Sequence, residues 1–296
     1  MKHRIALAFA VLLIAAQSLC VAAHAENRLK LSTTTSTEDS GLLNVLLPPF
    51  ERECSCKVDV IAVGTGKALK LGETGDVDVI LVHARTLEDK FVASGFGVNR
   101  RDVMFNDFVV IGPTSDPANL KDATSAIDAF RRIAASQSIF ISRGDDSGTD
   151  QKEKQIWSAT GIKPAGSWYR SAGQGMGEVI NMATELRAYT LADRGTYNMF
   201  RHGKTDLAIL YDGNLAFSRR GKTQPKLTVA QVTALTGPNG LFNPYGVIAV
   251  NPQRFPHVRF DLATRFEDYI TGPEGQRIID NYTVAGDPVF FTFKEK

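Results

Sequence analysis

Short hydrophobic runs and turn residues alternate along most of the chain. Runs of strand length occupy 29–31, 58–63, 76–82, 105–111, 138–142, 168–170, 207–211 and 245–250. Between several of them, apolar residues recur every three or four positions, which predicts helices. These helices span 123–136, 150–159, 176–189, 260–270 and 274–282. Strands that alternate with helices predict an α/β fold with mostly parallel sheets flanked by helices.

Two of the predicted strands mark crossings between two halves of the molecule. Strand 105–111 ends at a Gly-Pro pair, and strand 245–250 leads into a helical C-terminal segment. We therefore expect two lobes joined by a two-strand hinge. Lobe I comprises 26–110 plus 247–296, and lobe II comprises 111–246.

The most unusual stretch is a run of six hydroxyl residues at 32–37, Ser-Thr-Thr-Thr-Ser-Thr. It follows strand 29–31 and precedes a helix. The start of a helix leaves backbone N–H groups unpaired and carries partial positive charge, so that an anion can bind there. Hydroxyls add donors to the same place. One helix cap needs only one such residue, and here there are six in a row. By itself the run leaves simple capping as the alternative, and the units that follow strengthen the case for an anion site.

A second strand-turn-helix unit contains Gly64, Thr65, Gly66 and Lys67. A nucleotide-binding P-loop is excluded here. Its pattern G-x-x-x-x-G-K-[ST] begins with a glycine and ends with a serine or threonine, and this chain has Ile61 and Ala68 at those two positions. The remaining alternatives are a plain glycine turn and a second helix start with a hydroxyl beside it.

The third unit carries an arginine. Arg143 follows strand 138–142, and Ser147, Gly148 and Thr149 lead into the next helix. A guanidinium presents a rigid fork of donors that suits oxyanions. The alternative role is a local salt bridge between Arg143 and a neighbouring aspartate. In the fourth unit, Gly175 and Met176 begin a helix, and the alternatives are a plain glycine-started helix and a helix start whose backbone N–H groups join the same site.

The composition indicates an exported globular protein. The chain has 296 residues, of which 43% are hydrophobic and 22% charged. Residues 2–4 are basic, 5–16 are apolar, and 23–25 form an A-x-A cleavage pattern, so we expect a signal peptide at 1–25 and a mature chain from Glu26. No later stretch is apolar for long enough to span a membrane.

The charge balance argues against nucleic-acid binding. The full chain has 34 basic and 32 acidic residues. Two basic residues, Lys2 and Arg4, leave with the signal peptide, which gives 32 of each sign and a net charge of zero. A basic face for nucleic acid is not indicated.

Two cysteines remain after cleavage, Cys54 and Cys56. Their spacing makes a direct bridge strained in an extended run, because the two side chains then point to opposite faces. A lone C-x-C also lacks the ligands of a zinc site. We expect buried or half-buried thiols.

No enzyme signature stands out. The mature chain contains only His83, His202 and His257, none within a motif, and it has no G-x-S-x-G or H-E-x-x-H pattern. An exported hydrolase that uses Ser36 or Ser147 is the competing class. We expect a binding protein and not an enzyme.

Taken together, the four units resemble periplasmic solute-binding proteins of ABC importers, which have the type II two-lobed fold, and in particular their tungstate-binding members. The similar motifs are Ser32-Thr33-Thr34-Thr35-Ser36-Thr37, Val63-Gly64-Thr65-Gly66, Ser142-Arg143-Gly144-Asp145-Asp146-Ser147-Gly148-Thr149 and Gly173-Gln174-Gly175-Met176. The similarity runs over nearly the whole mature chain and includes Tyr-Ile-Thr-Gly-Pro-Glu-Gly at 269–275.

The resemblance implies an oxyanion held by hydroxyls, backbone N–H groups and one arginine. By resemblance these roles fall on Thr34, Thr35, Thr65, Arg143, Ser147 and Thr149, and we add Gly66, Gly148, Gly175 and Met176 as backbone candidates for ligand binding. It also implies a monomer in the periplasm, with a membrane permease as partner, no cofactor, and no metal bound as a free cation.

The identity of the oxyanion stays open at this point. Tungstate is a tetrahedral dianion that only accepts hydrogen bonds, so its site needs donors. Hydrogen phosphate also needs an acceptor for its proton, which Glu38, Asp39, Asp145 or Asp146 could supply. Molybdate, sulfate and phosphate are therefore the alternatives to tungstate.

Overall fold

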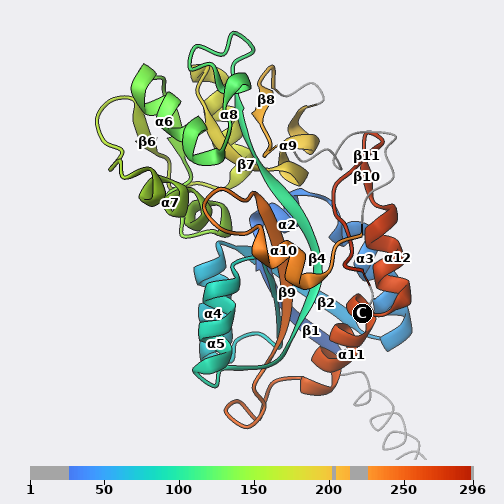
Figure 1. Cartoon of the computed structure of the whole chain (residues 1–296). Coiled ribbons are helices and arrows are strands. Elements are labelled where there is room, and N and C mark those ends of the chain that lie inside the picture. The colour runs from blue at the N-terminus through green and yellow to red at the C-terminus, as the bar shows by residue number, and fades with distance from the viewer. Residues whose placement is uncertain (1–26, 202–204, 214–225, 295–296) are drawn as a thin grey trace, which may run out of the picture.

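The computed structural model describes residues 27–201, 205–213 and 226–294. The expected signal peptide, 1–25, and the cleavage point before Glu26 lie outside the described residues. Strands and helices alternate through the described ranges (Figure 1), and the expected α/β fold class is confirmed. No helix in these ranges combines the length and the apolar character that a membrane crossing requires.

A mixed sheet forms the centre of the molecule, with strand order β2-β1-β3-β9-β4-β7 and with β8 beside β4. Its strands are β1 (Arg28–Thr34), β2 (Lys57–Val63), β3 (Val79–Val82), β4 (Gly97–Gly112), β7 (Thr190–Asp193), β8 (Ala208–Tyr211) and β9 (Phe242–Val250). The expected parallel pairing joins β1 to β2 and to β3. By contrast, β4 and β9 pair antiparallel with all their neighbours in the sheet.

Strand β4 is the longest strand of the sheet, and it runs from the part that contains β9 to the part that contains β7 and β8 (Figure 1). Residues up to Asp107 pair with β9, whereas those from Phe108 onward pair with β7 and β8. The sequence predicted only the second half of this strand. Its first half carries charged residues such as Arg100, which forms ion pairs with Glu88 and Asp102, and so it lacks the apolar pattern of a strand.

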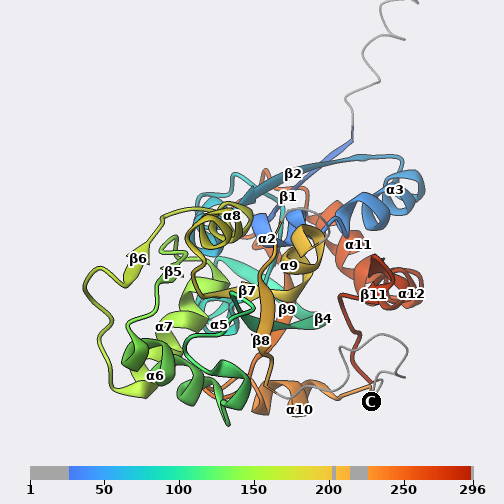
Figure 2. The same ribbon diagram turned by 90° about the horizontal axis from the view of Figure 1, so that it is seen from above.

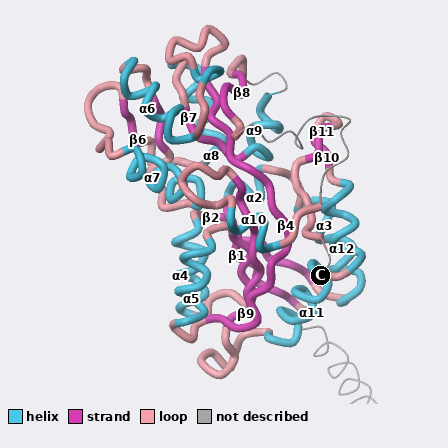
Figure 3. The backbone as a smooth tube through the Cα atoms, viewed as in Figure 1, coloured by secondary structure: helices cyan, strands magenta, loops and turns pink. Residues whose placement is uncertain are grey.

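Helices cover both faces of the β1–β3–β9 part of the sheet (Figure 3). On one side lie α4 (Thr65–Thr74) and α5 (Arg85–Ala93), and on the other α3 (Leu43–Cys54), α11 (Phe260–Thr271) and α12 (Pro273–Asn281). Alternate side chains of β3 enter the two cores, and all four of its residues are buried. This double burial explains the continuous apolar run at 79–82.

The remaining helices surround the other end of β4. They are α6 (Ala126–Ser136), α7 (Gly148–Thr160), α8 (Met176–Leu186) and α9 (Arg194–Arg201), with the parallel pair β5 (Phe140–Ser142) and β6 (Tyr169–Ser171) between them. Three shorter helices, α2 (Thr35–Asp39), α10 (Val229–Ala234) and the 3-10 turn Leu120–Asp122, and the small hairpin of β10 (Thr283–Val284) and β11 (Asp287–Pro288) complete the fold.

The hydrophobic cores divide along the chain in a simple way. Two clusters draw only on residues 29–104 and 245–290, and two others only on residues 108–241. A small fifth cluster, with Phe105, Phe242 and Phe291, packs where β4 and β9 meet. The predicted lobe boundaries remain a prediction.

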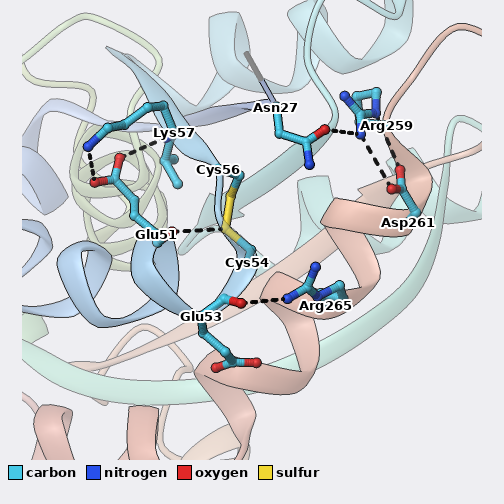
Figure 4. The surroundings of a disulfide bond; sticks show 10 residues. Asn27, Glu51, Glu53, Cys54, Cys56, Lys57, Arg259, Asp261 and Arg265 are labelled. Carbon is cyan, nitrogen blue, oxygen red and sulfur yellow. Dashed lines mark hydrogen bonds and ion pairs between the residues drawn. A yellow bond between two sulfur atoms is a disulfide. The ribbon is translucent and has the colours of Figure 1, made fainter. Parts of the chain in front are cut away.

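Cys54 and Cys56 form a disulfide bond (Figure 4), so the expectation of two thiols was wrong. That expectation assumed an extended chain. Helix α3 instead ends at Cys54, and Ser55 adopts a left-handed conformation with φ of 49°. This turn brings the two cysteines to the same side, with their Cα atoms 5.2 Å apart, which lies within the usual range for a disulfide.

Candidate functional site

Helix starts from distant parts of the sequence meet near the carboxyl ends of β1, β2 and β5. The Gly148 N–H, at the start of α7, donates to Thr65 Oγ1, at the start of α4, over 3.2 Å. A Cβ atom on Gly64 would lie 2.9 Å from the backbone oxygen of Asp145. The turn that follows β5 therefore packs directly on the turn that follows β2.

The short helix α2 lies beside the start of α8 and beside α9, as the view from above shows (Figure 2). Gly175, which precedes α8, is close enough to Thr35 that a Cβ atom there would be 3.7 Å from its hydroxyl oxygen. Neither Gly64 nor Gly175 caps its helix with a side chain. The first N–H groups of α4 and α8 thus have no side-chain cap.

Arg143 is the central side chain of this region, and it is almost completely buried, with 1% of its surface exposed. Its Nη1 donates to Ser36 Oγ over 2.8 Å and its Nη2 to Thr35 Oγ1 over 3.3 Å. Nη2 also lies 2.5 Å from Asp145 Oδ2. The salt bridge between Arg143 and a neighbouring aspartate, which was the alternative role for this side chain, is therefore present. The same guanidinium also donates to two hydroxyls of α2.

Two buried donors in this region have no partner. Arg143 Nε and Thr149 Oγ1 are both inaccessible and make no hydrogen bond in the structure. They lie six residues apart, on either side of the turn between β5 and α7. Since buried polar atoms are nearly always paired, two leftover donors that flank one turn make this turn a candidate place for an acceptor-rich ligand.

Ser147 and Thr34 are occupied as helix caps. Ser147 Oγ accepts from the Asp150 N–H at the start of α7. Thr34 Oγ1 accepts from the Thr37 N–H, and it also lies 2.7 Å from Thr37 Oγ1. The simple capping role that we weighed against an anion site therefore applies to Thr34.

The backbone candidates lie around the same turns. Gly66 faces Asp146, since a Cβ atom on it would lie 3.8 Å from Asp146 Cβ. The Met176 side chain is fully buried in the core with Val109 and Ile141, so only its backbone N–H can serve a ligand.

Sequence reasoning missed His83. It follows β3, is buried, and lies 3.1 Å from Thr34 Oγ1 through Nε2 and 2.9 Å from Asn243 Oδ1 through Nδ1. Burial, with a further contribution from the charge of Arg143, lowers the pKa of His83 to about 4. The ring is therefore neutral at pH 7. Its position after a strand that parallels β1 was the available signal, because ligands bind beyond the carboxyl ends of such strands.

A cavity of about 290 Å³ lies between α5 and α7, and its lining includes His83, Gly148 and Asn243. Its buried cation is Lys152, whose Nζ donates to Gln155 Oε1 and to the backbone oxygens of Thr236 and Gly237. Burial lowers the pKa of Lys152 to about 8. Since the three protons of this ammonium group already have acceptors, the leftover donors of Arg143 and Thr149 mark the better candidate site.

Within the described ranges, no three His, Cys, Asp or Glu side chains are grouped so as to hold a metal cation. The candidate site instead consists of hydroxyls, one guanidinium and helix starts, which all donate hydrogen bonds. Such a set of groups suits an anion.

The chain belongs to the PBP superfamily: the sequence model of the PBP superfamily domain matches residues 21–274. It is 42% identical over 271 residues to the tungstate-binding protein TupA of Peptoclostridium acidaminophilum, covering 90% of this chain and 86% of that protein. It is 36% identical to the tungstate-binding protein TupA of Campylobacter jejuni, covering 86% and 87% of the two chains.

A solved structure, described as the tungstate ABC transporter from Geobacter sulfurreducens, is 59% identical in sequence. It superposes with a TM-score of 0.73 and covers 86% of this chain and 98% of that one. The family that the sequence motifs suggested is therefore confirmed.

Proposed function

We propose that this protein is an exported solute-binding protein that captures tungstate and delivers it to an ABC transporter. The observation that carries the proposal is the buried pair of unpartnered donors, Arg143 Nε and Thr149 Oγ1. Relatives that are named for tungstate binding share most of the chain with this protein. The transporter partner, the periplasmic location, the monomeric state and the absence of catalysis belong to the same proposal.

The donor set fits a tetrahedral dianion. Transferring such an ion out of water is costly unless hydrogen bonds replace its hydration. Arg143 brings a full positive charge, of which Asp145 offsets part. Thr149 and Thr65 bring hydroxyls, and the starts of α4, α7 and α8 bring backbone N–H groups with favourable dipoles. In this proposal Gly66, Gly175 and Met176 contribute through their backbone, and the Gly148 N–H, which donates to Thr65 Oγ1, would have to turn to the ion or share its proton with it.

The proposed binding cycle uses the two lobes predicted from the sequence, 26–110 plus 247–296 and 111–246. The division of the hydrophobic cores supports a two-lobe arrangement, with the crossings a few residues earlier, between 104 and 108 and between 241 and 245. Contact between the starts of α4 and α7 corresponds to a closed cleft. Opening would occur by bending at β4 and β9, and closure around the ion would exclude water.

The surroundings of the site favour an oxyanion without a proton. The two oxygens of Asp145 already receive Arg143 Nη2 and the Ser147 N–H, and those of the buried Asp150 receive the Gly144 and Asp146 N–H groups. Asp146 is exposed and pairs with Lys154. Hydrogen phosphate would have to share an acceptor that is already engaged. Tungstate, molybdate and sulfate need no acceptor at neutral pH, and the named relatives favour tungstate among them.

Thermal melting of the dialysed mature protein tests the proposal directly. Equal concentrations of tungstate, molybdate, sulfate, phosphate and chloride are compared. A ligand at about 100 times its dissociation constant stabilises a folded protein by about 2.7 kcal/mol. We expect the largest shift with tungstate. Equal melting temperatures in all five solutions would contradict the proposal, and turnover of ester or phosphate-ester substrates would revive the hydrolase alternative.

A further inference from the structure

A chain of four buried side chains connects the candidate site to the strands that join the two halves. Thr34 at the end of β1 contacts His83, His83 contacts Asn243 on β9, and Asn243 contacts Asp193 at the end of β7, with distances of 3.1, 2.9 and 3.2 Å. Each of these side chains is less than 5% exposed. Because each of these side chains is almost completely buried, we assign the direction of each hydrogen bond from the chemistry of the groups that it joins.

Asp193 determines which group donates in each hydrogen bond of this series. Its Oδ2 receives Asn106 Nδ2, Asn243 Nδ2 and the hydroxyl of Tyr245, all of which are donors, so the carboxylate only accepts. The amide nitrogen of Asn243 therefore faces Asp193, and it also donates to Asn106 Oδ1 over 2.8 Å. This leaves Asn243 Oδ1 facing the ring of His83. It follows that His83 carries its proton on Nδ1.

A neutral His83 with its proton on Nδ1 has a lone pair on Nε2. The Thr34 hydroxyl must then donate to Nε2, since two acceptors cannot share the contact. With its own proton committed to His83, Thr34 Oγ1 accepts from both the N–H and the hydroxyl of Thr37. Every hydrogen-bonding position on Thr34 is thus occupied within the protein.

We infer that His83 is a positioning residue for the oxyanion site, acting through the hydroxyl of Thr34. Thr34 adjoins Thr35 and Ser36, whose hydroxyls hold the two Nη atoms of Arg143. By fixing Thr34, His83 fixes the start of α2 and the direction in which Arg143 points its remaining donor. Thr34 is then a support of the site and not a donor to the ion, unlike the role that the family resemblance implied. This inference rests on the proposed function.

Two substitutions separate this role from a purely structural one. In His83→Gln the amide reaches the position of Nε2, so it keeps an acceptor for Thr34 and loses Asn243. In His83→Asn the shorter amide reaches the position of Nδ1, so it keeps the contact with Asn243 and loses Thr34. If His83 positions the site through Thr34, the Gln variant binds tungstate better than the Asn variant. If His83 only holds β9 in place through Asn243, the Asn variant binds tungstate better than the Gln variant.

Calorimetric titration with tungstate and with sulfate, a smaller tetrahedral dianion, provides the readout. We expect affinity within about threefold of wild type for His83→Gln and a loss of roughly tenfold for His83→Asn. We also expect the Asn variant to lose part of the preference for tungstate over sulfate, because a loosened Arg143 fits ions of both sizes. A partly unfolded variant would lower the bound fraction for both ions equally, so the ratio of affinities reports on positioning. His257→Gln, at an exposed histidine that contacts the backbone oxygen of Gly75, is the control and should bind as wild type.

The hydrogen-bond chain can also be tested without a ligand. Long-range proton–nitrogen NMR spectra of the wild-type protein, assigned by comparison with His83→Gln, should show His83 protonated on Nδ1 and unprotonated on Nε2. A proton on Nε2 would overturn the inference. So would equal tungstate affinity in the Gln and Asn variants while the wild type binds, an outcome that leaves the proposed function intact. If the wild type binds no oxyanion, the proposed function and the positioning role both fail.

Discussion

Two buried arginines of this protein have contrasting surroundings. Arg194, at the start of α9, forms a two-pronged pair with Asp107, with Nε and Nη2 each 2.6 Å from a carboxylate oxygen, and it also approaches Asp212. Its buried nitrogens all have partners. Arg143 has one carboxylate and two hydroxyls as partners, and its Nε has none.

The difference separates a structural cation from a binding one. A buried charge is tolerated when its partners compensate for lost hydration. Arg194 meets this condition within the protein, so its removal should affect folding. Arg143 meets it only in part, and an incoming anion would supply what is missing.

The largest expected effect is on stability, at Arg194. Arg194→Gln leaves the fully buried carboxylate of Asp107 without its cation, which should lower the free energy of unfolding by about 3–5 kcal/mol. Urea unfolding of the mature protein measures the change. Arg85→Gln, which breaks an exposed pair with Asp89, is the control, with an expected cost below about 1 kcal/mol. Equal stability of the two variants would mean that the Arg194 pair is not structural.

Substitution of Arg143 should instead change tungstate affinity more than stability. Arg143→Gln removes the cation of the candidate site, and with charged hydrogen bonds worth about 1.5–3 kcal/mol each we expect roughly a hundredfold loss of tungstate affinity. Arg143→Lys keeps the charge without the fork and should lose less. The free energy of unfolding should change less than in Arg194→Gln. Wild-type affinity in both Arg143 variants would remove Arg143 from the binding site.

Thr149 should show a smaller effect of the same kind. Thr149→Val keeps the shape and removes the unpartnered hydroxyl, so affinity should fall about tenfold, while stability stays the same or rises slightly. Thr264, on α11, also has a buried hydroxyl without a partner, and Thr264→Val is the matched control that should leave affinity unchanged. If the two valine variants bind tungstate equally well, the unpartnered hydroxyl of Thr149 does not mark the site.

The smallest effect concerns Glu267, which has an unpartnered acceptor away from the site. Its Oε1 accepts from the Ala249 N–H, its Oε2 has no partner, and burial raises its pKa from 4.5 to about 7. Between these two values the folded state binds more protons than the unfolded state. Stability therefore falls as pH rises through this window, by at most about 1.4 kcal/mol per pH unit.

Glu267→Gln should flatten that slope without changing tungstate affinity. Urea unfolding at several pH values between 4.5 and 7 measures the slope for the variant and for the wild type. An unchanged slope would mean that other groups, such as Glu88 and Glu153, whose pKa values burial also raises to about 7, account for the pH dependence.

Local patterns predicted the strand-turn-helix units that carry the candidate residues. Arg143 directly follows β5, and Thr65 and Thr149 lie in the first turns of the helices that come after β2 and β5. Because β2 and β5 belong to different sheets, the meeting of their turns depends on the packing of the folded chain and could not be predicted from the order of the strands.

Features that depend on the packed structure were not predictable in this way. His83 lies in no motif, and its partner Asn243 is 160 residues away along the chain. The Cys54–Cys56 disulfide depends on the left-handed conformation of Ser55. The first half of β4 has charged residues that find partners only in the folded protein.

The most direct test of the central claim is a crystal structure of the protein with tungstate, with the metal located by its anomalous scattering. The account predicts one tungsten peak between the starts of α4, α7 and α8, with tungstate oxygens at hydrogen-bond distance from Arg143 Nε and Thr149 Oγ1. A peak in the cavity beside Lys152, or a fully occupied site that leaves both of those donors without a partner, would contradict it.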